Sequence, residues 1–298
     1  MLSGKQKLAS ILPVFFLGAA ALGRKIYAVG GENHMLSQLV TVEEYDPGTN
    51  SWKQKTPLQT PRSGLGLVAA SNGRIYAMGG SNQARTLSLA TIEEYDPQMN
   101  TWTPKSSMPV PTTNMGAAAS GDGKIYVVGG YDIQTQSNLA TLQRYDVTTD
   151  TWELLPPMPS ARSELAAVIG ANGKLYAIGG IGEAGKELAT VEEYDPVSRT
   201  WTTKNPMPTG RYCLAAVAGP HGKIYALGGL RSCAGLSIVE AFDPLENSWE
   251  AKSPMNTGRW GLAAAVDQDG KIYAVGGARR VGQQVEVLGT VEMGTALY

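Results

Sequence analysis

The sequence is poor in the residues on which metal sites and many active sites depend. Its 298 residues include only two histidines, His34 and His221, and two cysteines, Cys213 and Cys233. These residues do not cluster at ligand spacing, so the sequence predicts no metal site and no cofactor. Two cysteines cannot form a disulfide framework for so long a chain and are typical of a reducing compartment. We therefore expect a cytoplasmic protein.

Charge is also scarce. Charged residues make up 17% of the chain and the net charge is −1, with no basic run. Binding to a phosphate backbone needs a concentrated positive surface, so we expect no nucleic-acid partner. No segment repeats its apolar residues with a helical period, and the apolar run at residues 8–22 is too short for a membrane-spanning helix. We expect no membrane partner either.

Glycine and proline, in contrast, are abundant, at 36 and 17 residues. They recur at fixed intervals, most clearly in a phrase that occupies residues 270–277 and ends in Gly-Gly. Six Gly-Gly pairs of this kind lie 48 to 50 residues apart, at positions 30–31, 79–80, 129–130, 179–180, 228–229 and 276–277. Units of this size cannot each bury a core of their own, so they must pack on one another in a repeat architecture.

Each unit has the pattern of four short strands. In residues 162–208, an apolar run leads into an Asn172-Gly173 turn, and a second run ends at the Gly-Gly pair. A third run alternates up to Tyr194, and a fourth contains Trp201. Four antiparallel strands in each unit, without helices, are typical of a propeller blade. The sequence therefore predicts an all-β propeller of six blades.

The spacing of the large side chains is also constant. The tyrosine position precedes Trp by seven residues, as at Tyr95 and Trp102, and Trp precedes Met or Leu by six, as at Trp102 and Met108. Gly-Gly, Tyr-Asp-Pro, Trp and Pro-Met-Pro-x-x-Arg, in this order over almost the whole chain, resemble the kelch repeat. The resemblance implies a single kelch propeller over residues 1–298, with blades at about 14–56, 62–106, 112–156, 162–205, 211–253 and 259–293.

The sixth unit lacks a fourth strand, because Gly294 stands at the tyrosine position and the chain stops at Tyr298. Residues 4–9 lie in the register of a fourth strand. We predict that they complete the last blade and close the ring, as kelch propellers commonly do, which leaves no open sheet edge.

The N-terminal region also allows a different interpretation. Lys5 and Lys7 precede an apolar run that ends in small residues, as in a secretory signal over residues 1–22, which would make the protein secreted or periplasmic. The same run aligns with the apolar stretch that precedes every Gly-Gly phrase. We favour a blade strand, because cleavage would remove a strand from the first unit.

An arginine opens the innermost strand in four of the blades, at Arg62, Arg162, Arg211 and Arg259. A recurrent arginine commonly binds loop carbonyl groups. This position nevertheless lies at one mouth of the expected central channel, on the same face as the Gly-Gly loops. The arginines are therefore candidates for both a structural and a binding role.

Several aromatic residues do not belong to the repeat pattern. Phe15, Tyr212 and Trp260 share the position after the arginine, where other blades have Ser63, Thr113 and Ser163, and Tyr131 directly follows a Gly-Gly pair. Packing does not require aromatics at a position that serine or threonine can fill. We therefore expect a binding surface on this rim.

Kelch-type substrate adaptors clasp a short acidic peptide with these two sets of loops. The resemblance implies a non-enzymatic scaffold that binds a protein or peptide through Arg62, Ser63, Arg162, Ser163, Arg211, Tyr212, Arg259 and Trp260, and we add Tyr131 to this set. The variable Gly-Gly loops would provide specificity.

Other interpretations stay open. The rim aromatics would also suit a plug in the channel mouth or a carbohydrate-binding surface. A kelch-type sugar mutarotase or epimerase would need an acid/base group in the central pocket, and Glu164, close to Arg162, is the inner-strand carboxylate that fits this role.

Overall fold

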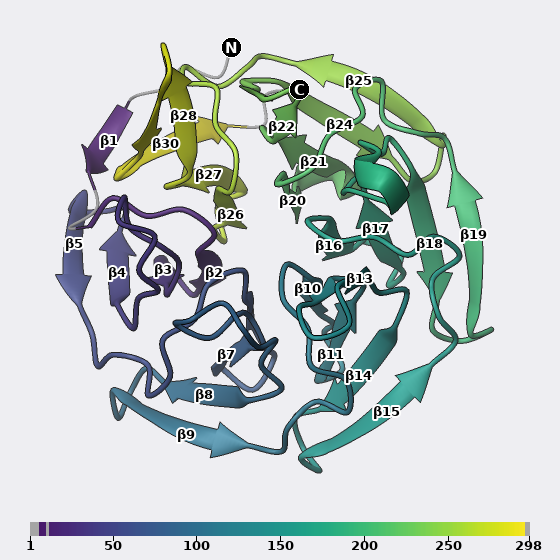
Figure 1. The fold of residues 1–298 in the computed structure, drawn as a ribbon, viewed down its shortest axis with the longest axis horizontal. Helices are drawn as coiled ribbons and strands as arrows, with labels where there is room; N and C mark the ends of the chain where they lie inside the picture. Colours follow the sequence, from purple (N-terminus) through teal and green to yellow (C-terminus); the bar gives the residue numbers. More distant parts are fainter. Residues whose placement is uncertain (1–5, 10–11, 296–298) are drawn as a thin grey trace.

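The computed structural model describes residues 6–9 and 12–295 of the chain. Its strands form six four-stranded antiparallel sheets arranged radially around a central axis (Figure 1). The predicted all-β propeller with six blades of four strands is therefore confirmed. Among the described residues, no helix is long and apolar enough to cross a membrane.

Each blade runs from an inner strand at the axis to an outer strand at the perimeter. Blades 1 to 3 consist of β2 (Gly18–Leu22), β3 (Lys25–Val29), β4 (Val42–Asp46) and β5 (Ser51–Gln54); β6 (Gly66–Ala69), β7 (Ile75–Met78), β8 (Ile92–Asp96) and β9 (Thr101–Lys105); and β10 (Gly116–Ala119), β11 (Lys124–Val128), β14 (Leu142–Asp146) and β15 (Thr151–Leu155). Blades 4 to 6 consist of β16 (Ala166–Ile169), β17 (Leu175–Ile178), β18 (Val191–Asp195) and β19 (Thr200–Lys204); β20 (Ala215–Ala218), β21 (Ile224–Leu227), β24 (Val239–Asp243) and β25 (Ser248–Lys252); and β26 (Ala263–Val266), β27 (Lys271–Val275), β30 (Thr290–Thr295) and β1 (Gln6–Ala9).

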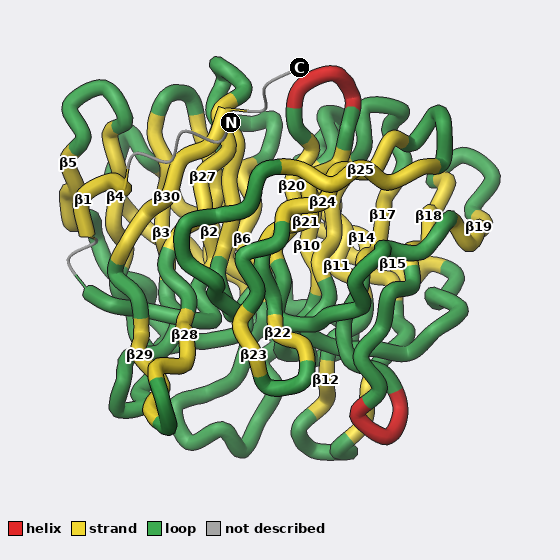
Figure 2. The backbone as a smooth tube through the Cα atoms, turned by 90° about the horizontal axis from the view of Figure 1, so that it is seen from above, coloured by secondary structure: helices red, strands yellow, loops and turns green. Residues whose placement is uncertain are grey.

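The Gly-Gly loops, which join the second and third strands of each blade, gather on one side of the molecule, here called the loop face. Three of them carry small hairpins, formed by β12 (Tyr131–Asp132) and β13 (Ser137–Asn138), β22 (Leu230–Arg231) and β23 (Ala234–Gly235), and β28 (Ala278–Val281) and β29 (Gln284–Val287). A fourth contains the 3₁₀ turn η1 (Glu183–Gly185), whereas η2 (Pro220–Gly222) lies on the opposite face (Figure 2).

The N-terminal segment closes the ring. Strand β1 pairs antiparallel with β30 as the outer strand of blade 6, with Gln6 opposite Glu292 and Ala9 opposite Thr290. This confirms the predicted closure, although Gly4 and Lys5 of the predicted segment lie outside the described residues. The apolar run that also resembled a secretory signal supplies β2, the inner strand of blade 1.

The core lies between neighbouring blades, where six apolar clusters fill the six interfaces. Within a blade, the tyrosine of the third strand packs on the tryptophan of the fourth; Tyr95 and Trp102 have ring centroids 4.9 Å apart. The Trp102 indole N–H donates to the Thr56 carbonyl of the preceding connection at 2.9 Å. One side chain thus buries a large apolar area and satisfies its single donor across a blade interface.

The Gly-Gly pairs allow the blades to approach each other. The first glycine has a φ between 58° and 64° in every blade. A Cβ atom on Gly179, for example, would lie 2.7 Å from the Arg211 carbonyl oxygen of the next blade. The N–H of the second glycine donates to this same carbonyl, as from Gly180 to Arg211 at 3.0 Å. Six such bonds of 2.8–3.0 Å link each blade to the next around the ring.

This contact predicts that the first glycine is far more sensitive to substitution than a glycine in an open turn. Gly179→Ala would combine a left-handed backbone with a clash against Arg211, whereas Gly173→Ala has the left-handed backbone with no neighbour within 4 Å. We expect the free energy of unfolding to fall by about 1 kcal/mol for Gly173→Ala and by roughly 3 kcal/mol for Gly179→Ala. Urea titration of both variants measures the difference, and equal losses would refute the clash.

Candidate functional site

The four arginines at the channel mouth are all fully buried, with an exposure of 0%. The Arg62 guanidinium donates to the carbonyls of Gly79 and Thr91, both at 2.9 Å, and pairs with Glu93 at 2.7 Å. The other three form ion pairs with glutamates of their own blades: Arg162 with Glu192, Arg211 with Glu240 and Arg259 with Glu292.

The prediction that these guanidinium groups contact a ligand is therefore corrected. Burial lowers the pKa of each arginine, and the paired glutamate opposes this change. Blade 3 supports a structural role, because Thr112 and Gln143 replace the charged pair there. Thr112 donates to the Gly129 carbonyl at 3.2 Å, and Gln143 bonds to the backbone of Val110. A neutral pair thus occupies the same positions.

The serines that follow two of the arginines are buried too. Ser63 is 2% exposed and Ser163 is 4% exposed. The Ser63 hydroxyl donates to Glu32 at 2.5 Å, and the Ser163 hydroxyl donates to Asn138 at 2.8 Å. Both hydroxyls therefore fix the Gly-Gly loops of the preceding blades, and their predicted ligand contacts are corrected as well.

The off-pattern aromatics gather on the loop face at blades 5, 6 and 1. Trp260 and Phe15 are buried in an apolar cluster, with Tyr212 and Phe16 packed against it as partly exposed members. The β22–β23 hairpin covers Trp260, so that a Cβ on Gly235 would lie 2.8 Å from the indole ring. Trp260 therefore supports the rim, while Tyr212 stays accessible. Tyr131, also partly exposed, lies on blade 3, outside this cluster.

A further ring of residues, two positions after the arginine, surrounds the axis itself. All six have a φ between 51° and 60°. Each N–H donates to the carbonyl of the residue at the same position in the preceding blade, at 2.7–2.9 Å, and the bond from Phe16 to Gly261 closes the circle. Going round, the residues are Phe16, Gly64, Asn114, Glu164, Cys213 and Gly261.

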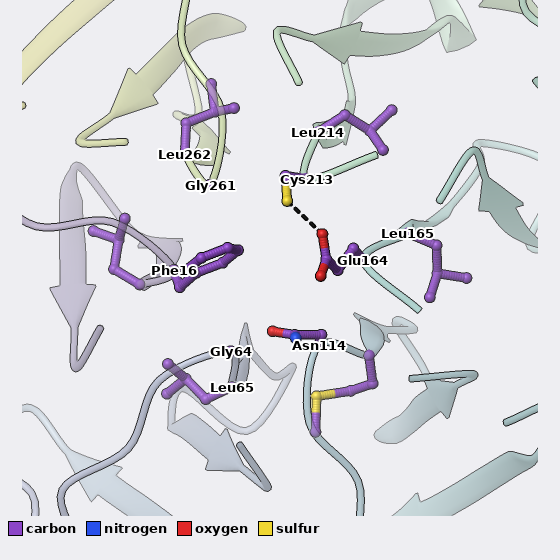
Figure 3. A pocket seen from close by; sticks show the side chains of 12 residues that line it. Phe16, Gly64, Leu65, Asn114, Glu164, Leu165, Cys213, Leu214, Gly261 and Leu262 are labelled. Carbon is purple, nitrogen blue, oxygen red and sulfur yellow. Dashed lines mark hydrogen bonds between the residues drawn. The ribbon is translucent and has the colours of Figure 1, made fainter. Parts of the chain in front are cut away.

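This ring lines a pocket of about 90 Å³ at the channel mouth. Figure 3 shows the side chains of Phe16, Asn114, Glu164 and Cys213 directed toward the axis. The side chains that follow four of the ring residues point away from it: Leu65, Leu165, Leu214 and Leu262. Below the pocket, a channel of about 300 Å³ is lined mainly by alanines of the inner strands. Among the residues that line the pocket, the side chains that converge on the axis are thus those of the ring.

Glu164 is the one carboxylate of this pocket. Burial raises its pKa, and a hydrogen bond from the Cys213 thiol, 2.6 Å away, opposes the shift. Burial and the nearby Glu164 raise the pKa of Cys213 well above its ordinary value, which favours the protonated thiol. Within the described residues, no group of three or more histidine, cysteine, aspartate and glutamate side chains is placed to hold a metal ion.

The sequence indicated Glu164 but not Phe16, Asn114 or Cys213. These residues share one position in the repeat, but the residue type there changes between blades, with glycine in two of them, so no pattern marks them. Alignment of the position after each Ser63 equivalent would have grouped them. Only the closed ring shows that they meet.

The Gly-Gly loops of three adjacent blades expose large apolar side chains. Val281 and Val285 of blade 6 are 53% and 50% exposed, Met35 and Leu36 of blade 1 are 73% and 54% exposed, and Leu87 of blade 2 is 43% exposed. A second opening of about 460 Å³, beside β23 and β28, is lined by Arg279, Arg280 and small residues. The loop face thus combines apolar side chains with accessible cations at its edge.

Comparison with known proteins agrees with this architecture. The family model for the KLHDC2/KLHL20/DRC7 Kelch-repeats domain matches residues 17–229 and 124–291. The chain belongs to the kelch-repeat family. Among similar kelch proteins, the zebrafish (Danio rerio) "Kelch-like ECH-associated protein 1A" is 42% identical over 80 residues, which are 26% of this chain and 13% of that protein.

Two further relatives match over shorter segments. The mouse (Mus musculus) "Influenza virus NS1A-binding protein homolog" is 42% identical and the human (Homo sapiens) "Influenza virus NS1A-binding protein" is 41% identical, each over 66 residues, or 22% of this chain. The matched segments are 10% of each of these proteins. This kelch chain therefore shares only a small part of the length of these relatives.

The buried pair in blade 4 predicts strong coupling between two substitutions. Arg162→Thr or Glu192→Gln alone leaves a buried, unpaired charge, which costs about 3–5 kcal/mol. The double variant recreates the Thr and Gln of blade 3, so we expect it to be more stable than Arg162→Thr alone. Urea unfolding of the three variants measures the coupling. Additive losses would contradict the proposed pairing.

The raised pKa of Glu164 predicts a pH-dependent effect of Glu164→Gln. Below the ordinary glutamate pKa, the carboxyl is protonated in both folded and unfolded chains, so the substitution changes stability little. As the pH rises through the folded pKa, wild type must bury a charge, and the variant becomes the more stable protein. The stability difference, measured by urea unfolding from pH 4 to pH 8, should grow with pH, and a difference that does not change with pH would contradict the prediction.

Proposed function

We propose that this kelch propeller is a non-enzymatic scaffold that binds a protein or peptide segment across its loop face. The observation that supports this proposal is the arc of exposed apolar side chains on the Gly-Gly loops of blades 6, 1 and 2, from Val281 and Val285 through Met35 to Leu87. Exposed apolar groups that gather on the variable loops of a rigid scaffold are typical of an interaction surface.

Because the four arginines are buried and paired with glutamates, other residues would have to recognise the ligand. Tyr131 and Tyr212 remain candidates, because both are partly exposed on the loop face. Arg231 and Arg280 are exposed on the β22–β23 and β28–β29 hairpins and would supply the accessible positive charge. The names of two relatives, an ECH-associated protein and an NS1A-binding protein, are consistent with a protein ligand for this chain.

An enzyme of the sugar mutarotase or epimerase type is the second candidate, favoured by one observation. Glu164 faces the central pocket and its pKa is raised by burial, as expected of a general acid. The residues that line this pocket include no second carboxylate and no histidine, and Arg162 is paired with Glu192 inside the blade. Exchange between sugar anomers, followed by NMR for wild type and Glu164→Gln, discriminates the two functions.

A peptide-display selection tests the scaffold proposal without knowledge of the natural ligand. Peptides of 12 residues, displayed on phage, would be selected on the folded wild-type protein and their affinities measured. The loop-face variant Tyr212→Ala/Met35→Ser should weaken the selected peptides about tenfold, because interface residues of this kind contribute more than 1 kcal/mol each.

The control variant changes equally exposed apolar residues on turns between third and fourth strands. Val197 and Leu245 are 92% and 90% exposed, and Val197→Ser/Leu245→Ser should leave peptide affinity unchanged. Loss of binding in the control variant but not in the loop-face variant would place the interaction on the face opposite the Gly-Gly loops and would contradict the proposal. Failure to select any saturable peptide would also contradict the proposal.

A further inference from the structure

The Glu164 carboxyl group has an unusual position for an acid. It lies at the channel mouth, held by backbone bonds on both sides: its N–H donates to Asn114 and its carbonyl accepts from Cys213. No ion pair involving Glu164 occurs within the described residues, and its side chain is bonded by the Cys213 thiol, a weak donor. A half-buried carboxylate without a cation or strong donors is costly, so the pocket favours a ligand that supplies them.

The opposite wall of the mouth is aromatic. Phe16 of blade 1 faces Glu164 of blade 4 across the axis (Figure 3). Gly64 and Gly261 flank Phe16 in the ring; the Asn114 amide oxygen and the Thr113 hydroxyl occupy the space beside Gly64, whereas the nearest atoms to Gly261 belong to Phe16 itself. Asn114 adds an amide on the side next to Glu164. A group that enters from the loop face thus meets an aromatic ring, an amide and a carboxyl within one small pocket.

The size of the pocket limits what can enter. A volume of about 90 Å³ is enough for the tip of one side chain. The alanine-lined channel continues below the pocket, so the ring does not block an extended side chain that enters it. The entrant is therefore a slender group whose polar end stays near the ring.

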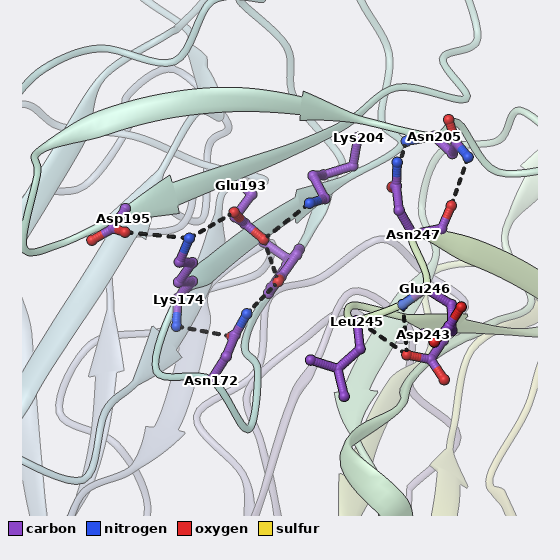
Figure 4. A network of polar contacts seen from close by, with 11 residues as sticks. Asn172, Lys174, Glu193, Asp195, Lys204, Asn205, Asp243, Leu245, Glu246 and Asn247 are labelled. Atoms are coloured by element: carbon purple, nitrogen blue, oxygen red, sulfur yellow. Dashed lines mark hydrogen bonds and ion pairs between the residues drawn. The ribbon is translucent and has the colours of Figure 1, made fainter.

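The surrounding charges select the sign of this group. The arginines nearest to the mouth are neutralised by their own glutamates, so an anionic group would find no free cation among them and would be repelled by Glu164. A cation, in contrast, would compensate Glu164 and interact favourably with the face of Phe16. Figure 4 shows how the perimeter differs: Glu193 on the outer part of blade 4 already has the cations Lys174 and Lys204 beside it.

We propose that the channel mouth is a receptor for a single cationic side chain, lysine or arginine, presented by the bound protein segment. Its charged end pairs with Glu164, its aliphatic part packs on Phe16, and the Asn114 oxygen accepts a further N–H. This inference rests on the proposed scaffold function, since a binding partner supplies the side chain. It identifies the chemistry of the anchor that the partner inserts.

Small probes test the pocket independently of any partner. n-Butylguanidinium carries the proposed cation, and n-butylurea is a neutral analogue of similar shape. Titration of each into ¹⁵N-labelled protein, followed by NMR, should show saturable shifts of the Glu164 and Cys213 amide signals with the cation. We expect at least fivefold weaker binding of the urea and of the cation to Glu164→Gln, whereas the control Glu183→Gln should bind the cation as wild type does.

The outcomes separate this inference from the proposed function. Three outcomes would refute the proposed cation receptor: equal binding of the two probes, unchanged binding of the cation to a folded Glu164→Gln variant, or no shift with either probe. If the selected phage peptides then still require Tyr212 and Met35, the scaffold function stands without it. If the cation binds at Glu164 while no peptide depends on the loop face, the scaffold function fails and the receptor site stands. Enrichment of lysine or arginine in peptides that bind Glu164→Gln at least fivefold more weakly supports both.

Discussion

The propeller depends on one backbone contact between neighbouring blades. The N–H of the second glycine in each Gly-Gly pair donates to the carbonyl that opens the inner strand of the next blade, such as Arg211. The approach is so close that a side chain at the first glycine would meet the same carbonyl. A contact of this type saturates polar backbone atoms at a buried interface, and its repetition around the ring explains why the glycines recur in every blade.

The buried arginines take part in the same contact between blades. Their carbonyls accept the interblade bond, while their side chains tie the loop of their own blade to a glutamate of its third strand, as Arg62 does with Glu93. The loop face is therefore rigid at its base, and the positive charge of the buried arginines is paired with glutamates within the blades. What remains for recognition is the variable part: the outer loops and the six side chains that surround the axis.

Much of the fold was predictable from the sequence, because packing repeats itself. Tyr95 and Trp102 keep their spacing in every complete blade because the same two strands must meet there. Ring closure by residues 6–9 was predictable from a strand missing in the last unit. The candidate site was predicted less well. Arg62 and Trp260 were assigned to a binding surface, but a periodic or bulky residue at the rim is equally able to serve packing, and burial decides between the two roles.

The sequence by itself determined the number of blades, their strand order and the face on which the variable loops lie, since these follow from local patterns repeated six times. Only the tertiary structure decided that the arginines are neutralised and that Phe16, Asn114, Glu164 and Cys213 face one another across the axis. The physical reason is the circular symmetry of the fold. Residues about 50 positions apart occupy adjacent places on one ring. A position whose residue type changes between blades therefore forms a site only when the ring closes.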